Sequence, residues 1–375
     1  MSPFCQAKRQ TLTTASRSDS IDGVDVPTEQ RETKPVSKSQ AVVSTFRAVR
    51  YRPGVVTLLD QTRLPAEERY VDLESLEDVA RAIEDLVVRG APAIGLTAAY
   101  GLCVAVRKGS APEAADARLR TTRPTAVNLF WALDRMARRW KEGAGIAELE
   151  AEALAIDEED VAACRRMGEL GAELIPEGAG VLTHCNTGGL ATSELGTALA
   201  AIRVAHAQGK RIRVYADETR PVLQGSRLTV WELMKDGVDV TLIPDGAAAH
   251  LMYEGLIDCG IVGADRVARN GDVANKIGTR GVACLLRAHE KPFYVAAPFS
   301  TVDLTLASGS DIRIEERKPE EVTHIRGVAI APEGAKVRNP AFDITPAAWI
   351  SDLVTDRGRT GGDIAAGLHR FAELG

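Results

Sequence analysis

Two short apolar runs in this sequence each lead to a side chain that could take part in catalysis. Gly180-Val181-Leu182 leads to Cys185, and Ile261-Val262-Gly263-Ala264 leads to Asp265. Apolar runs of this length, bounded by glycine or polar residues, are typical of buried parallel strands. Ligands of open α/β sheets bind just beyond the carboxyl ends of such strands. The sequence therefore predicts a thiol and a carboxyl group in one small-molecule site.

Both side chains also have a structural interpretation. A cysteine at a strand end is more often buried packing than a reactive group. However, Asn186 and Gly188-Gly189 are turn residues that would leave backbone N–H groups open, and a helix N-terminus here would stabilise the thiolate. Asp265 could cap a helix or pair with Arg266. Its apolar surroundings favour instead a partly desolvated carboxyl with a raised pKa, which could donate a proton near neutral pH.

Basic residues beside glycine or proline could bind an anion. Arg89 stands before Gly90 and Ala91, where a guanidinium and open backbone N–H groups would suit a phosphate. Arg123 comes just before an expected helix start and could add a second cation. Either arginine could equally be a surface residue.

Lys276 and His184 each have two interpretations. Lys276 lies between Ala274 and Ile277 beside Gly278, so a position facing a pocket competes with the usual surface position. His184 could act as a general base. A histidine at a strand end more often binds the backbone, and we expect it to support the site without reacting.

The elements that must position these residues follow two patterns. Over residues 44–175 the periodicity is mostly helical. From residue 176 onward, apolar strands alternate with helix-length segments, which predicts a parallel sheet covered by helices. The expected strands are 46–51, 55–59, 180–184, 211–216, 238–243, 259–264 and 292–297, and the expected helices are 73–88, 93–107, 125–141, 146–173, 190–208, 221–236, 246–256 and 275–289.

The predicted fold class is α/β. A Rossmann-like parallel-sheet domain is expected over 176–375, after a mostly helical domain over 44–175 that carries a small antiparallel sheet. Residues 1–43 are rich in Ser, Thr, Gln and charge, which predicts a disordered extension. Residues 1–18 also resemble a transit peptide, a weaker alternative because no apolar stripe is present. The acidic run 157–160 predicts a solvated helix face.

Composition narrows the classes of function. The net charge of −6, from 46 basic and 52 acidic residues, argues against binding nucleic acid through its phosphates. No apolar stretch reaches the length of about 18 residues that spans a membrane. None of the six cysteines shows a C-x-x-C or other metal spacing, so we expect no metal and reduced thiols in the cytoplasm. No G-x-G-x-x-G follows the first strand, so a dinucleotide cofactor has little support.

A series of motifs then covers most of the chain in a fixed order. The motifs are Leu58–Thr62, Arg89–Gly95, Arg123–Leu129, Thr183–Asn186, Asp217–Gly225, Gly263–Arg266, Asn275–Thr279 and Asn339–Asp343. Over roughly residues 46–350 the chain thereby resembles the 5-methylthioribose-1-phosphate isomerase family of methionine salvage. The wider family shares its fold with ribose-1,5-bisphosphate isomerases and with regulatory subunits of a translation-initiation exchange factor. Those subunits lack the cysteine and aspartate in this setting, so a non-catalytic role is the less favoured alternative.

The resemblance implies a role for each matching position. Cys185 matches the catalytic cysteine and Asp265 matches the proton donor. The resemblance also implies that the chain forms a homodimer. It implies that this homodimer converts 5-methylthio-α-D-ribose 1-phosphate to 5-methylthio-D-ribulose 1-phosphate without a cofactor. The positions that match substrate-binding residues are Arg89, Gly90, Ala91, Arg123, Gln224, Asn275 and Lys276.

Two positions depart from the family pattern. Thr187-Gly188-Gly189 stands where Ala-Gly-Ala is common, and Arg280 stands where tyrosine is usual. If Arg280 faced the pocket, it would favour a more polar 5-substituent. Ribose 1,5-bisphosphate and 5-deoxyribose 1-phosphate stay as alternative substrates. In the implied mechanism Asp265 protonates the ring oxygen and Cys185 acts at C2 and C1, by proton transfer or beside a hydride shift.

Overall fold

The computed structural model describes residue 42 and residues 44–124 and 126–374. The expectations for the extension over residues 1–43, other than Val42, lie outside the described residues. In the described part of the chain, no helix is both long and apolar enough to cross a membrane.

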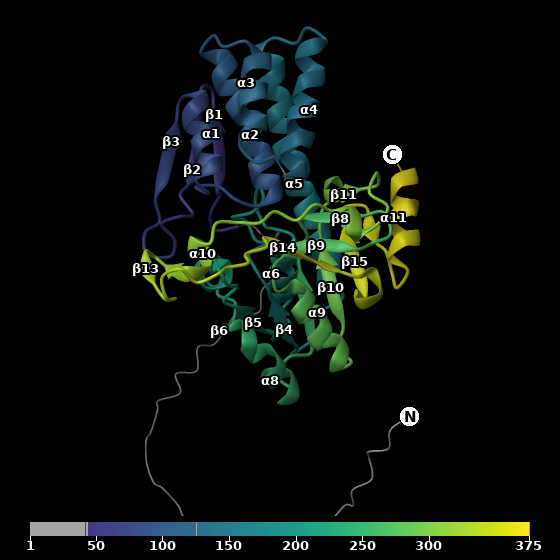
Figure 1. Cartoon of the computed structure of the whole chain (residues 1–375). Coiled ribbons are helices and arrows are strands. Elements are labelled where there is room, and N and C mark those ends of the chain that lie inside the picture. The colour runs from purple at the N-terminus through teal and green to yellow at the C-terminus, as the bar shows by residue number, and fades with distance from the viewer. Residues whose placement is uncertain (1–41, 43, 125, 375) are drawn as a thin grey trace, which may run out of the picture. The chain divides into compact units, whose positions relative to one another are not determined.

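The first part of the described chain is built around one buried helix. Helix α2 contacts each of the helices α1, α3, α4 and α5, and its residues from Ala93 to Ala105 are all buried. Figure 1 shows α2 to α5 side by side, with a small antiparallel sheet of order β1-β2-β3 next to them. The bounds are β1 (Val49–Arg52), β2 (Val55–Leu59), β3 (Tyr70–Leu73), α1 (Leu76–Glu84), α2 (Ala91–Arg107), α3 (Pro112–Arg120), α4 (Val127–Lys141) and α5 (Ile146–Ala172).

Three expectations for this region were wrong or incomplete. The helix expected over 73–88 is shorter, because Leu73 pairs with Val56 in the sheet and Ser75 caps the helix start. Helix α3 was not predicted. The acidic run 157–160 is not a solvated face throughout, since Asp157 is 7% exposed and its carboxylate accepts the Tyr100 hydroxyl. Burial also raises the pKa of Asp160 to about 6.

A mostly parallel sheet organises the chain from β4 onward. Within the described residues it has seven strands in the order β16-β15-β10-β7-β4-β5-β6. Neighbours from β15 to β6 run parallel, and only the edge strand β16 is antiparallel. The five strands predicted from sequence are all present. Their bounds, with the two that were missed, are β4 (Gly180–Thr183), β5 (Arg213–Asp217), β6 (Val240–Ile243), β7 (Cys259–Val262), β10 (Phe293–Ala296), β15 (Asp352–Thr355) and β16 (Gly358–Arg359).

Helices bury both faces of this sheet, because consecutive strand residues point to opposite sides. Val181, Val214 and Ile261 pack with residues of α5 and α6. Leu182, Tyr215 and Val262, their chain neighbours, pack with residues of α8, α9 and α11. The helix bounds here are α6 (Ala198–Ala207), α7 (Val230–Lys235), α8 (Ala248–Tyr253), α9 (Thr279–Ala288), α10 (Glu320–Thr323) and α11 (Ile364–Glu373), with a π-helical turn, Gly225–Thr229, directly before α7.

A second, mixed sheet was missed by sequence reasoning. Its strand order is β11-β8-β9-β14. The helix expected over 275–289 begins only at Thr279, because Asn275 and Lys276 belong to a strand that pairs with β14. The helix expected over 190–208 begins only at Ala198, which leaves a long loop after β4. The remaining bounds are β8 (Arg266–Ala268), β9 (Val273–Lys276), β11 (Val302–Asp303), β12 (His324–Ile325), β13 (Val328–Ala329) and β14 (Phe342–Thr345).

Candidate functional site

The strands that carry Cys185 and Asp265 are direct neighbours. β4 and β7 run parallel, with Val181 opposite Cys259 and Leu182 opposite Gly260. Cys185 follows β4 and Asp265 follows β7 at the same edge of the sheet. The predicted placement of both groups beyond carboxyl ends at one edge of the sheet is confirmed, and the structure adds that the two strands are neighbours.

Two threonine hydroxyls fix the backbone of Cys185. The residue has a φ of 65°, an uncommon value for a side chain other than glycine. Its N–H donates to the Thr219 hydroxyl oxygen at 2.9 Å, and its carbonyl accepts from the Thr229 hydroxyl at 2.6 Å. The thiol is therefore held in one place by residues from two other segments of the chain.

Burial favours the neutral form of this thiol. Burial raises the pKa of Cys185 above its usual value, while Arg89 and Lys276 oppose the shift. The expectation of a thiolate stabilised by a helix N-terminus was wrong, because the next helix, α6, begins only at Ala198. Cys185 thus enters the site as a neutral thiol with cations near it.

A buried carboxylate organises the loop that follows Cys185. Glu232 is fully buried and accepts hydrogen bonds from the Asn186 amide, from the N–H groups of Gly189 and Leu190, and from Arg203. The expectation of open N–H groups at Gly188-Gly189 was wrong for Gly189. A glycine is needed at 188, since a Cβ there would lie 2.1 Å from a Glu232 carboxylate oxygen.

Asp265 presents a carboxyl group without a hydrogen-bond partner among the described residues. Its backbone N–H donates to Ala274 at 2.9 Å, which places it beside β9, and Arg266 pairs instead with Asp303. Neither capping nor pairing with Arg266 explains this aspartate. Burial raises the pKa of Asp265, and the cations of Lys276, Arg89 and Arg123 oppose that shift. The sequence-based prediction of a raised pKa is confirmed in direction.

Arg89, Gly90 and Ala91 form the start of helix α2. Arg89 donates to the Asn186 carbonyl at 2.7 and 3.1 Å and to the Asn186 side chain at 2.9 Å. Gly90 has a φ of 93°, and a Cβ on it would lie 2.4 Å from the Ala191 Cβ. The N–H groups of a first helical turn lack intrahelical partners and favour anions. Pro92 has no N–H, and the Ala93 N–H donates to the Ala191 carbonyl at 3.1 Å, so this helix start brings the N–H groups of Gly90 and Ala91 and a cation close to the cysteine loop.

Arg123 is a largely buried cation. In the described part of the chain its guanidinium makes no hydrogen bond or ion pair. Burial lowers the pKa of this guanidinium, and Glu315 opposes the effect. Asp265 and Arg89 also act on it electrostatically. A desolvated guanidinium in such a position is suited to an anionic ligand.

Of the other three sequence-predicted residues, Lys276 lies near Cys185 and Asp265, with Asn275 directly before it, whereas no contact in the described chain brings Gln224 to them. Lys276 follows Asn275 on β9; its ammonium donates to the Ala341 carbonyl at 3.1 Å and lies 4.8 Å from the Phe342 ring centre. The Asn275 amide donates to Thr279. Gln224 is buried with its carbonyl oxygen unpaired, and it directly precedes the π-helical turn that ends at Thr229. Electrostatic contacts link Lys276 to Cys185 and Asp265, whereas no direct contact joins Gln224 to either.

Arg280 does not contribute to this site. It is exposed, donates to the Ile344 carbonyl at 2.6 Å and lies over the Trp349 ring. Arg280 would favour a more polar 5-substituent only if it faced the pocket, and these contacts hold it elsewhere.

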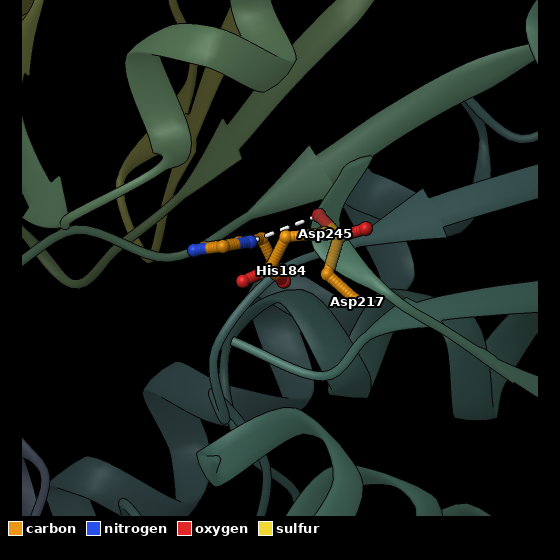
Figure 2. Close-up of side chains that lie close together, drawn as sticks. All are labelled: His184, Asp217 and Asp245. Atoms are coloured by element: carbon orange, nitrogen blue, oxygen red, sulfur yellow. Dashed lines mark hydrogen bonds and ion pairs between the residues drawn. The ribbon is translucent and has the colours of Figure 1, made fainter. Parts of the chain in front are cut away.

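His184 and two aspartates form a polar cluster next to Cys185. The cluster consists of His184, which follows β4, Asp217, which ends β5, and Asp245, which comes shortly after β6, and Figure 2 shows the three side chains converging. The two ring nitrogens of His184 lie 2.9 Å from Asp217 and 2.9 Å from the Ile277 carbonyl. The expectation that His184 binds the backbone is confirmed.

Several residues that shape the site were not recognised from the sequence. Thr229 and Glu232 lie in a segment that was predicted only as helix, and Thr219, although part of the motif Asp217–Gly225, gave no sign of its contact with Cys185. The Gly188-Gly189 pair was the one indication of a close approach, because glycine is favoured where no Cβ fits. Their partners come from distant parts of the chain, which a single sequence does not reveal.

The fold is that of an α/β protein, with a buried thiol and a carboxyl group beyond neighbouring parallel strands and with cations near both. Residues 87–361 match the initiation factor 2 subunit family. Among curated proteins named methylthioribose-1-phosphate isomerase, that of Geotalea uraniireducens (strain Rf4) is 54% identical over 334 residues, covering 85% of this chain and 96% of that protein. That of Anaeromyxobacter sp. (strain K) is 57% identical over 321 residues, covering 85% and 94%.

Solved structures agree with this similarity. The 5-methylthioribose 1-phosphate isomerase of Pyrococcus horikoshii OT3 aligns with a TM-score of 0.84 at 44% identity, covering 88% of this chain and 97% of that one. The translation initiation factor eIF-2B, subunit delta, of A. fulgidus aligns with a TM-score of 0.77 at 43% identity, covering 87% and 100%. The chain belongs to the initiation factor 2 subunit family and, within it, to the methylthioribose-1-phosphate isomerases.

Proposed function

We propose that this chain is an aldose–ketose isomerase that converts 5-methylthio-α-D-ribose 1-phosphate to 5-methylthio-D-ribulose 1-phosphate in methionine salvage. The observation that carries the proposal is the pair Cys185 and Asp265, which lie beyond adjacent strands and whose pKa values are both raised by burial. The curated relatives, similar over nearly their whole length, support the substrate.

The substrate phosphate binds at the start of α2. Arg89 and Arg123 supply charge, and the N–H groups of Gly90 and Ala91 supply hydrogen bonds. Lys276 adds a third cation near the reacting carbons. The other polar contacts to the sugar come from Gln224, whose buried carbonyl oxygen has no protein partner, and from Asn275.

Asp265 acts as the proton donor that opens the ring. The 1-phosphate ester prevents spontaneous ring opening, so a proton must reach the ring oxygen while the ester stays intact. A carboxyl group whose pKa is raised by burial is protonated over a wider pH range and suits this step. No protein group competes for its proton, since its carboxyl group has no hydrogen-bond partner in the described chain.

Cys185 acts while hydrogen moves between C2 and C1. In one route its sulfur removes the C2 proton, which requires the thiolate. In the other the neutral thiol stabilises charge beside a hydride shift. Burial raises the pKa of Cys185 and disfavours the thiolate, so the neutral-thiol route is the better supported of the two. These residues need no metal or organic cofactor for either route.

The 5-substituent is methylthio. Arg280, the one sequence feature that favoured a more polar group, is bonded to Ile344 and lies over Trp349. No other departure from the family pattern points to ribose 1,5-bisphosphate or 5-deoxyribose 1-phosphate.

The proposal extends to the organisation of the protein. Residues 44–175 form a mostly helical domain and residues 176–375 a Rossmann-like domain. The strand order β6-β5-β4-β7-β10-β15 supports this, because it matches the 3-2-1-4-5-6 order of that fold, with the site where the order reverses. A cytoplasmic homodimer is part of the same proposal.

The test is direct conversion of substrate. Purified protein is incubated with 5-methylthioribose 1-phosphate without added cofactor, and the ketose is followed by proton NMR. Ribose 1,5-bisphosphate and 5-deoxyribose 1-phosphate are run in parallel, and methylthio is expected to give the highest kcat/KM. If the protein binds one of these three sugar phosphates but converts none of them, the non-catalytic alternative would be favoured. The similarity to the A. fulgidus factor is the reason to test that alternative.

A further inference from the structure

We infer that His184 and Asp217 form a positioning pair, which fixes the segment carrying Asn275 and Lys276 relative to the Cys185 loop. This inference rests on the proposed function and assigns these residues no direct contact with substrate. It concerns a cluster that the proposed mechanism does not use.

The imidazole of His184 bridges two parts of the site. The ring is 1% exposed. Its Nδ1 lies 2.9 Å from an Asp217 carboxylate oxygen, and its Nε2 lies 2.9 Å from the Ile277 carbonyl. Figure 2 shows the first of these bonds as a dashed line. Ile277 directly follows Lys276, and His184 directly precedes Cys185. The bond between the His184 ring and the Ile277 carbonyl therefore connects the end of strand β9 to the start of the Cys185 loop.

The contact with the Ile277 segment is also steric. Gly278 has a φ of 106°, and a Cβ there would lie 2.7 Å from the His184 ring. The N–H of Gly278 is bonded on its other side to Asp343. The turn at Gly278 therefore packs tightly against the imidazole. A smaller side chain at position 184 would leave the turn without this contact.

Asp217 extends the connection to Cys185 itself. The Asp217 carbonyl accepts from the Thr219 hydroxyl at 3.2 Å, and that hydroxyl oxygen accepts the Cys185 N–H. Asp245 holds the same loop by accepting the N–H groups of Thr219 and Arg220, each at 2.7 Å. A series of hydrogen bonds thus runs from the Ile277 carbonyl through His184, Asp217 and Thr219 to the backbone N–H of Cys185.

Two other roles for the cluster conflict with these contacts. A metal ion would need a free ring nitrogen, but both nitrogens of His184 are engaged, and both oxygens of Asp245 accept backbone N–H groups. A general base also needs a nitrogen open to substrate. The Nε2 atom must carry its proton to bind the Ile277 carbonyl, and Nδ1 faces Asp217.

The experiment compares variants that break or keep the bridge. His184→Phe removes both bonds while keeping a ring, and we expect kcat/KM to fall by about 100-fold, with a raised KM, because misplacement of about 1 Å costs that much. Asp217→Asn can still hydrogen-bond a neutral ring, so its kcat/KM should stay close to wild type. His250→Gln, at an exposed histidine of α8, is the matched control and should change neither constant.

A second readout is independent of turnover. Alkylation of Cys185 by iodoacetamide, mapped by mass spectrometry against the buried Cys259, should become faster in His184→Phe and stay unchanged in Asp217→Asn. His184→Gln, which keeps a donor to Ile277, replaces the Phe variant if that variant does not fold. Wild-type KM, kcat and alkylation in a folded His184 variant would overturn the inference. Failure of the wild-type enzyme to turn over substrate would overturn only the proposed function.

A third measurement tests whether the cluster binds a metal ion. Dialysis against a chelator is expected to leave wild-type alkylation and turnover unchanged. Stoichiometric binding of zinc to wild type, lost in His184→Phe, would overturn the positioning role in favour of a metal site.

Discussion

Arg89 donates three hydrogen bonds to Asn186, at 2.7, 2.9 and 3.1 Å, and thereby joins the start of helix α2 to the residue after Cys185. The same cation acts electrostatically on both Cys185 and Asp265. These bonds use the Arg89 guanidinium to hold the loop after Cys185, so fewer of its N–H groups are left to bind substrate. Arg123, whose guanidinium has no partner in the described chain, is the cation left for the substrate phosphate.

Replacement of Arg123 should therefore weaken substrate binding without affecting the fold. Arg123→Gln is expected to lower kcat/KM by about 10- to 100-fold, since a hydrogen bond to a charged group contributes about 1.5–3 kcal/mol. Steady-state kinetics would show the effect mainly in KM. Arg138→Gln, at an exposed arginine of α4, is the control, and an equal loss in both variants would count against a specific phosphate contact.

Gly90 should not tolerate a side chain. Gly90→Ala would place a Cβ 2.4 Å from that of Ala191, so helix α2 would have to move and activity should be largely lost. Gly109→Ala is a matched control, because its φ of 91° is similar but its surroundings are open. It should cost only the backbone strain of about 1–2 kcal/mol. Thermal unfolding and turnover of both variants would check this, and equal effects would refute a close approach at Gly90.

Asp265 is expected to reduce stability at neutral pH. Its folded pKa is raised, so the native state holds this proton more tightly than the unfolded state. Stability is therefore lost as pH rises from the unfolded value of about 3.9 through the raised folded value. Asp265→Asn removes the penalty and should raise Tm at about pH 8, with a smaller gain toward pH 4. A Tm that falls at neutral pH would contradict the desolvation argument.

The main features of the sheet and the reactive pair could be predicted from sequence because they depend on local patterns. Runs such as Gly180-Val181-Leu182 are apolar, short and bounded by turn residues, so strands and their polar ends were recognisable. Asn275 and Lys276 stay predictions as binding residues, and their strand was mistaken for a helix. Residue type and neighbouring residues suggested the chemical role, whereas pairing with Phe342 and Asp343, 66 and 68 residues later in the chain, decided the secondary structure.

The supporting contacts could not be predicted, because each joins segments far apart in the chain. Glu232 stabilises the loop after Cys185, and Thr219 fixes the backbone of Cys185, yet neither stands in a pattern that indicates burial. The state of the Cys185 thiol was also misjudged. A helix start was expected from turn residues, but the long loop from 186 to 197 leaves burial as the main influence on its pKa.

The most direct test of the account is turnover of 5-methylthioribose 1-phosphate by wild type and by two single variants. Cys185→Ser and Asp265→Asn should each lower kcat by at least about 100-fold, since each removes a group that acts on the reacting atoms. Cys284→Ser, at an exposed cysteine, should keep wild-type turnover, and circular dichroism should show all three variants folded. Near-normal kcat in both folded active-site variants would contradict the assignment of Cys185 and Asp265 as the catalytic pair.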